Sequence, residues 1–171
     1  MANPTTVRVT HRYSVPSERV FDAWLTPVQA ARFLFATRTG NILHCEIDPR
    51  VAGEFTVTDR RPTADGDESF FDAQHRGVYV EIERPHRLAF DFNVEPYSDA
   101  PTRVTIDIVS MGPQMCELVL THDLGEGETA RVNADRTRKG WETMLQQLDK
   151  LLTTRVWGLP YKPALRTPGS A

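Results

Sequence analysis

The stretch Arg138-Lys-Gly-Trp-Glu-Thr-Met-Leu-Gln-Gln-Leu-Asp-Lys-Leu-Leu152 decides how this chain folds. Its apolar residues recur with the period of an α-helix, so they lie along one side of it. This apolar stripe consists of Trp141, Met144, Leu145, Leu148 and Leu152. A helix with so wide a stripe must bury it, and most of the chain before it has the alternating pattern of β-strands. We therefore predict an α+β fold in which a long C-terminal helix packs across a curved antiparallel sheet.

The segments before this helix predict about seven strands, with two short helices after the first strand. The first helix begins with Pro16 at its first position, and the second follows a capping box of Thr26 and Gln29. In the second strand we expect Leu43, Cys45 and Ile47 to share the buried face. The expected strands span residues 7–13, 41–47, 53–59, 70–83, 88–94, 104–108 and 116–122.

Composition places the chain among ordinary globular proteins. Its 171 residues fit one domain over residues 1–155, followed by a C-terminal extension over residues 156–171. A net charge of −3 gives no reason to expect nucleic acid or an anionic membrane as a partner, and no apolar run is long enough to span a bilayer. Neither a secretory signal nor a set of paired cysteines is evident, so we expect a cytoplasmic protein. We expect it to be a monomer or a homodimer.

Residues that could carry chemistry are few. His44, Cys45 and Glu46 are metal-ligand types, but adjacent strand residues point to opposite faces, so we expect no metal and no cofactor. A nucleophilic pair of a histidine with Cys45 or Cys116 is an open alternative, although both cysteines suit a buried core position. The basic residues at 131, 136, 138 and 139 are interleaved with acids, which is typical of a solvated helix face.

Four short motifs occur in an order that resembles one known superfamily. They are Pro16-Ser-Glu-Arg-Val-Phe-Asp-Ala-Trp24 with Thr26-Pro27, Asp48-Pro-Arg-Val-Ala-Gly53, Gly77-Val-Tyr-Val-Glu-Ile-Glu-Arg-Pro-His-Arg-Leu88, and Gly140-Trp141. The chain resembles the START-like, or SRPBCC, superfamily with its helix-grip fold. Within it the chain is similar to single-domain proteins related to the C-terminal domain of the activator of the Hsp90 ATPase. Two positions depart from the pattern, because Ala52 replaces a usual glycine and Arg84 replaces a usual proline.

This resemblance implies a cavity between the sheet and the long helix, which often holds an apolar molecule. It does not imply one activity, because the superfamily includes carriers, cyclases and co-chaperone domains. We expect binding of a small hydrophobic or aromatic molecule without catalysis. The alternatives are a modulator of a heat-shock ATPase, with a chaperone as partner, and a cyclase or hydrolase that uses histidine and tyrosine as acid and base.

The residues that we expect to line the cavity come from the helices, the strands and the long-helix stripe. They are Trp24, Phe33, Phe55, Phe71, Tyr79, Phe90, Phe92, His122, Trp141, Met144 and Leu145. Among polar residues, we expect His75, Arg76, Tyr79 and His122 to be directed at the cavity, because an apolar site usually holds a few polar groups that orient its ligand.

Overall fold

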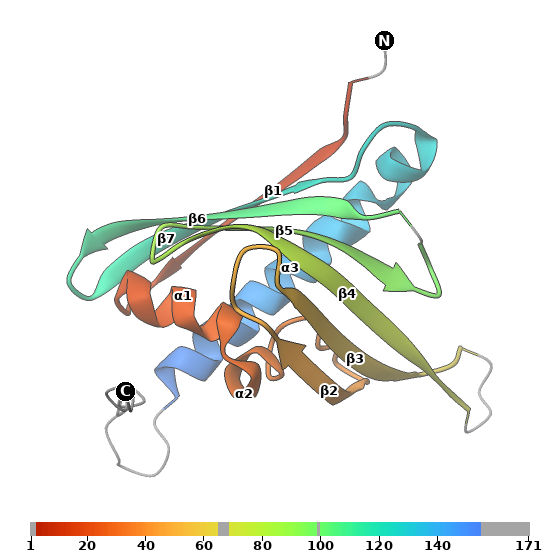
Figure 1. Ribbon diagram of the computed structural model, residues 1–171, viewed down its shortest axis with the longest axis horizontal. Helices are drawn as coiled ribbons and strands as arrows, with labels where there is room; N and C mark the ends of the chain where they lie inside the picture. Colours follow the sequence, from red (N-terminus) through yellow and green to blue (C-terminus); the bar gives the residue numbers. More distant parts are fainter. Residues whose placement is uncertain (1–2, 65–68, 99, 155–171) are drawn as a thin grey trace.

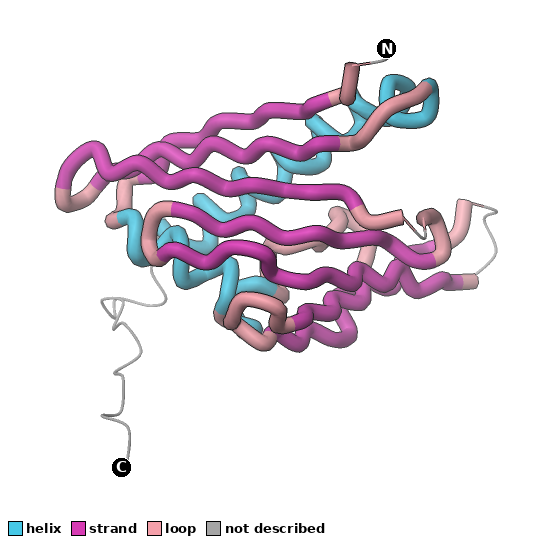
Figure 2. The backbone as a smooth tube through the Cα atoms, turned by 45° about the horizontal axis from the view of Figure 1, so that its top comes forward, coloured by secondary structure: helices cyan, strands magenta, loops and turns pink. Residues whose placement is uncertain are grey.

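The computed structural model describes residues 3–64, 69–98 and 100–154 and confirms the predicted fold class. The elements are β1 (Thr6–Tyr13), α1 (Ser17–Leu25), α2 (Pro27–Ala30), β2 (Asn41–Ile47), β3 (Glu54–Pro62), β4 (Phe70–Glu83), β5 (Arg87–Glu95), β6 (Thr102–Gly112), β7 (Met115–Asp123) and α3 (Glu128–Thr153). The strands form one curved seven-stranded antiparallel sheet in the order β1-β7-β6-β5-β4-β3-β2. All three helices lie against the same face of this sheet (Figures 1 and 2).

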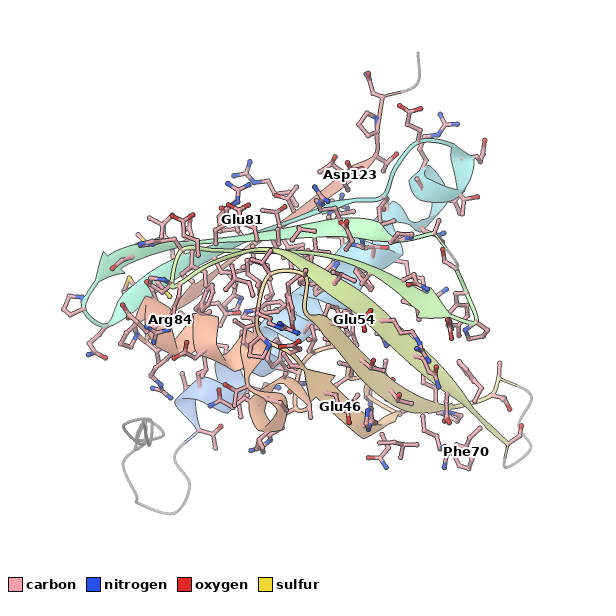
Figure 3. All side chains as sticks on the ribbon, viewed as in Figure 1. Glu46, Glu54, Phe70, Glu81, Arg84 and Asp123 are labelled. Carbon is pink, nitrogen blue, oxygen red and sulfur yellow. The ribbon has the colours of Figure 1, made fainter. Side chains whose placement is uncertain are left out.

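The long helix α3 packs on the sheet through the predicted stripe. Trp141, Leu145, Leu148 and Leu152 are buried, and Met144 is partly buried. The Tyr13 hydroxyl of β1 donates a hydrogen bond to the backbone oxygen of Leu145 at 3.0 Å, which fixes the helix against the edge of the sheet. Side chains crowd the space between the sheet and α3, whereas Glu81 points away from it on the other face (Figure 3).

Two details of the short helices differ from the prediction. Pro16 is the N-cap of α1 and not its first helical residue, because its ψ of 153° is extended. Thr26 makes no side-chain cap on α2, so the expected capping box with Gln29 is wrong. The Thr26 hydroxyl instead donates to the backbone oxygen of Asp22 at 2.7 Å, at the end of the preceding helix. The proline at 27 occupies the start of α2, where its missing N–H costs no helical hydrogen bond.

The expected face of Leu43 is also wrong. The pairing of β2 with β3 shifts register between Ile42 and His44, as at a β-bulge. One extra residue reverses the alternation of side chains, so Ile42 joins Cys45 and Ile47 on the partly buried face. Leu43 is exposed at 46%.

The β2–β3 turn explains one departure from the motif pattern. Gly53 permits a close backbone approach, because a Cβ there would lie 2.3 Å from the backbone oxygen of Asp48. Ala52 adopts a φ of 67°, the left-handed conformation that favours glycine. The usual glycine at this position therefore matches the backbone, and Ala52 holds the same conformation with strain.

We predict that Ala52→Gly stabilises the protein. Relief of the left-handed conformation is worth about 1–2 kcal/mol, and the greater freedom of glycine in the unfolded chain offsets part of it, so the expected net gain is about 1 kcal/mol. Urea unfolding monitored by circular dichroism measures it. The matched control is Ala31→Gly, because Ala31 has a φ of −59° and should only lose stability. Equal losses in both variants would contradict the strain at Ala52.

The second departure, Arg84, connects the β4–β5 turn to α1. Its guanidinium binds the Asp22 carboxylate through two hydrogen bonds of 2.8 and 2.9 Å. Both side chains are close to half exposed, so the pair contributes little to stability. Its structural consequence is to hold the turn beside the helix.

Both cysteines are free, with Cys116 buried in β7 and Cys45 partly buried in β2. In the part of the chain that the structure describes, no helix is long and apolar enough to cross a membrane. The extension expected over residues 156–171 lies outside the described residues.

Candidate ligand-binding site

A cavity of about 540 Å³ lies between the sheet and the N-terminal half of α3. This volume falls within the range of small-molecule sites. Its sheet side is formed by residues of β3 to β7, and the connection between β5 and β6 closes one end. Its helix side is formed by Trp141 and Met144 of the apolar stripe and by an adjacent row of α3 that includes Asn133, Thr137 and Gly140.

The sheet register brings distant residues to this cavity. Directly opposite residues of antiparallel strands share a face, so His75 of β4 lies beside Val94 of β5, and both line the cavity. The next residue, Arg76, points to the other face, where it is exposed and does not line the cavity. It pairs there with Gln74 and Glu95. The expectation that Arg76 is directed at the cavity is therefore wrong.

His122 lies at the centre of a hydrogen-bonded chain in the cavity wall. The Trp141 indole Nε1–H donates to His122 Nδ1 at 3.0 Å, so the imidazole proton is on Nε2. This Nε2–H donates to the Thr102 hydroxyl at 2.7 Å. Burial lowers the pKa of His122 to about 4, so the ring is neutral at pH 7. The main consequence of this hydrogen-bonded chain is to fix the orientation of Trp141 on the cavity wall.

His75 is held by hydrogen bonds to the backbone of the sheet. Its Nδ1 lies 3.2 Å from the backbone oxygen of Val57, which can only accept, so the proton is on Nδ1. Burial, reinforced by the positive charge of Arg61, lowers the pKa of His75 to about 4. The backbone of Ala73 makes a further hydrogen bond with the ring, so His75 is a neutral residue anchored to the backbone of the cavity wall.

Phe35 joins the aromatic part of the cavity wall, and the sequence did not indicate it. Its ring stacks on His75 with centroids 4.1 Å apart and packs against Phe92 at 5.0 Å. Its φ is 58°, a strained conformation for a bulky residue, and its backbone N–H donates to the Met144 sulfur at 3.3 Å. Contacts with His75, Phe92 and Met144 hold this conformation, and the local sequence does not predict it.

The structure divides the residues expected at the site. Phe92, His122, Trp141 and Met144 line the cavity. Six others are buried in the core and are not among its lining residues: Trp24, Phe33, Phe55, Tyr79, Phe90 and Leu145. Phe71, at the far end of β4, contacts Tyr97 edge-on at 6.1 Å and is also not a lining residue. Lining residues that the sequence did not indicate include Phe35, Arg61, Val94, Thr102 and Arg136.

The geometry gives little support to acid–base catalysis. A histidine with a pKa near 4 is a weak base at neutral pH, and His122 already uses both ring nitrogens. Tyr79, the expected tyrosine partner, packs on Phe55 at 5.3 Å in the core, and burial raises its pKa. The expected histidine–tyrosine pair is therefore not assembled at the cavity.

The geometry also gives little support to nucleophilic or metal-dependent catalysis at this cavity. Burial raises the pKa of the Cys45 and Cys116 thiols, which disfavours the reactive thiolate, and neither lines this cavity. Among the described residues no group of three or more metal-ligating side chains comes together. The cavity is suited to holding a molecule.

A second hollow, of about 600 Å³, lies beside the β2–β3 turn. Its lining residues include Glu46, Asp48, Arg50 and Glu54. The lining comes mostly from one hairpin and includes four charged side chains but no aromatic one, so the hollow lacks the apolar wall that is typical of a small-molecule site. We regard the smaller, aromatic cavity as the functional candidate.

Comparison with known proteins agrees with this architecture. Residues 14–153 match the family described as Activator of Hsp90 ATPase homolog 1-like protein. The chain belongs to this family. No curated protein sequence matches it.

Solved structures of similar fold come from several organisms. A protein from Chromobacterium violaceum is 22% identical with a TM-score of 0.73, and covers 89% of this chain and 100% of its own. A Mycobacterium smegmatis protein is 14% identical with a TM-score of 0.71, over 90% of this chain and 98% of its own. An Hsp90 activator from Plasmodium falciparum is 21% identical with a TM-score of 0.63, over 86% of this chain and 96% of its own. At these identities the likeness shows the fold shared by this family member.

Proposed function

We propose that this family member binds a small hydrophobic or aromatic molecule in the cavity between the sheet and α3. The observation that carries the proposal is the composition of the wall. Phe35, Phe92 and Trp141 supply aromatic surface, and the neutral ring of His75 stacks on Phe35 beside them. Small-molecule sites usually combine an apolar or aromatic wall with polar groups that orient the ligand, and the lining of this cavity contains both.

Gly140 supports the same proposal. A glycine in a helix interior costs about 1 kcal/mol relative to alanine. Close packing does not require it here, because a Cβ at Gly140 would meet only the Met144 methyl group, at 4.0 Å. Since Gly140 lines the cavity, its missing side chain leaves room there at the expense of helix stability.

We predict that the uncharged dye N-phenyl-1-naphthylamine binds the native protein with a stoichiometry of one. Gly140→Leu, which places a branched side chain in the cavity, should weaken this binding by about tenfold or more, because the dye then loses buried contact area. The same substitution should leave the protein folded or make it more stable, since leucine is a strong helix former. Fluorescence titration and thermal unfolding measure the two effects.

The matched control is Val132→Leu, on the same helix at a position 69% exposed, which should leave dye affinity unchanged. Met144→Trp fills the cavity from the next turn of the helix and provides a second obstruction. Unchanged dye affinity in both folded cavity variants would overturn the proposed site.

A second candidate function is modulation of a heat-shock ATPase, with a chaperone as partner. It is favoured by the family description and by the likeness in fold to the Hsp90 activator from Plasmodium falciparum. The β6–β7 end offers exposed apolar side chains at Val109, Met111 and Met115, which suit a contact with another protein. The ATPase rate of a purified Hsp90, measured with and without this protein, tests the candidate independently of dye binding.

We also propose that the protein is located in the cytoplasm. The free thiols of Cys45 and Cys116 suit a reducing compartment, where disulfides are rare. Fractionation of the host cell followed by immunoblotting tests this location.

A further inference from the structure

Two arginines line the cavity with guanidinium groups that the fold leaves available. Arg61 comes from β3, and Arg136 comes from α3. Neither belongs to the aromatic wall on which the proposed function rests. A purely apolar ligand would bind neither guanidinium group. The two arginines therefore suggest that the ligand also carries a group that can bind a guanidinium.

Arg61 is held in one orientation. Its Nε–H donates to the Asp59 carboxylate at 2.7 Å, and Asp59 is fully buried. The Thr37 hydroxyl donates to the same carboxylate oxygen at 2.9 Å. Gly40 makes room for this arrangement, because a Cβ there would lie 2.4 Å from the other oxygen of Asp59. The guanidinium of Arg61 is therefore anchored on one side.

The other side of the Arg61 guanidinium is free to bind. Among the described residues its terminal Nη atoms have no hydrogen-bond or ion-pair partner. Its side chain is 23% exposed, and it belongs to the cavity wall. A planar pair of N–H donors in a partly buried setting matches the oxygens of a carboxylate, which it can bind with two hydrogen bonds.

Arg136 differs from the other basic residues of its helix. Arg131 pairs with Glu128, and Arg138 and Lys139 pair with Asp135. Arg136 has no ion-pair partner within the described ranges, and it lines the cavity. The sequence pattern assigned all four to a solvated helix face, but Arg136 lies where it can attract a negative charge toward the cavity.

One carboxylate, Glu126, also lines the cavity, and its position separates it from Arg61. Glu126 follows β7, and β7 is four strand spacings from β3, which is about 19 Å along the sheet. It precedes α3, so about 12 Å of helix axis separates the helix start from Arg136. Repulsion from Glu126 is largely screened over such distances at physiological salt.

We propose that the ligand is an amphipathic anion, an apolar body that carries one carboxylate or similar anionic group. The apolar body occupies the aromatic part of the cavity, and Arg61 donates two hydrogen bonds to the anionic oxygens. Arg136, exposed near the same cavity, adds attraction without a fixed geometry. This inference rests on the proposed function, because it needs the cavity to be a binding site.

The test uses decanoate and decan-1-ol, which share a ten-carbon chain and differ in the charged group. Each is expected to displace N-phenyl-1-naphthylamine from the 171-residue protein, and the displacement gives its affinity. Arg61→Gln should weaken decanoate by about tenfold, and Arg136→Gln by about threefold because an exposed charge contributes less. Both variants should keep the affinities for decan-1-ol and for the dye.

Controls separate a binding role from a structural one. Arg131→Gln, on the same helix but paired with Glu128 outside the cavity, should leave decanoate affinity unchanged. If loss of the Asp59 partner prevents Arg61→Gln from folding, Arg61→Lys keeps a charge beside Asp59 and removes the planar fork, and it should weaken decanoate alone. Unchanged decanoate affinity in the folded Arg61 and Arg136 variants, with dye binding intact, would overturn this inference only. Absence of dye binding to the parent protein would overturn the proposed function and this inference with it.

Discussion

Trp141→Ala is expected to destabilise the protein by about 3–5 kcal/mol, the usual cost of truncating a buried aromatic side chain. Trp141 is 2% exposed, and its indole packs against rings from three other parts of the chain. The ring centroids lie 5.8 Å from Phe35, 6.3 Å from Trp24 and 6.4 Å from Phe92. The substitution also removes the only Nε1–H that binds His122 Nδ1 in the described structure, which leaves a buried acceptor unpaired. A loss of this size is a large part of the stability of a typical domain.

Chemical denaturation of Trp141→Ala measures this loss. The variant Trp141→Phe separates the part due to the hydrogen bond from the part due to packing. The phenylalanine retains most of the ring volume but lacks the donor, so it should lose about 1–3 kcal/mol. Val132→Ala, on an exposed position of the same helix, should change stability by less than about 0.5 kcal/mol. A melting temperature of Trp141→Ala within a degree or two of the parent would show that α3 is not anchored at this residue.

The fold could be predicted because its signals are local and repeated. The stripe from Trp141 to Leu152 identified the buried side of α3, and alternation identified the strands. Short motifs in the right order identified the family. The misplaced Leu43 shows the limit of alternation, because the bulge in β2 shifts it by one residue without a sequence signal.

The cavity was harder to predict because it depends on what the packing leaves unfilled. Leu145, Leu148 and Leu152 of the apolar stripe fill the core, whereas the cavity wall uses Trp141 and Met144 together with an adjacent row of α3. That row includes small or polar residues such as Thr137 and Gly140, which no search for large apolar side chains would select. Arg61 follows the end of the expected strand at residue 59, and only the extended β3 places it on the face that bears Asp59.

Acid should unfold this protein between about pH 6.5 and pH 4, and two buried histidines are the reason. His75 and His122 each have a pKa lowered from 6.5 to about 4, chiefly by burial. Below pH 6.5 the unfolded chain binds protons at these histidines and the folded protein does not, so stability falls as the pH falls. A difference of about 2.5 pKa units at 1.36 kcal/mol per unit is about 3 kcal/mol for each histidine. Together they approach the whole stability of a typical domain.

The free energy of unfolding, measured in urea at a series of pH values, should change by about 2.7 kcal/mol per pH unit near pH 5, because two protons are linked to unfolding there. His75→Phe keeps a ring that can stack on Phe35, and His122→Gln keeps groups that can bind Trp141 and Thr102. Each should halve the slope, because each removes one of the two protons. Val132→Leu, at an exposed position of α3, changes no titratable group and should leave the slope unchanged. A slope that stays the same in the His75 and His122 variants would assign the acid sensitivity to other groups, and the neutral state of the two buried histidines would lose its support.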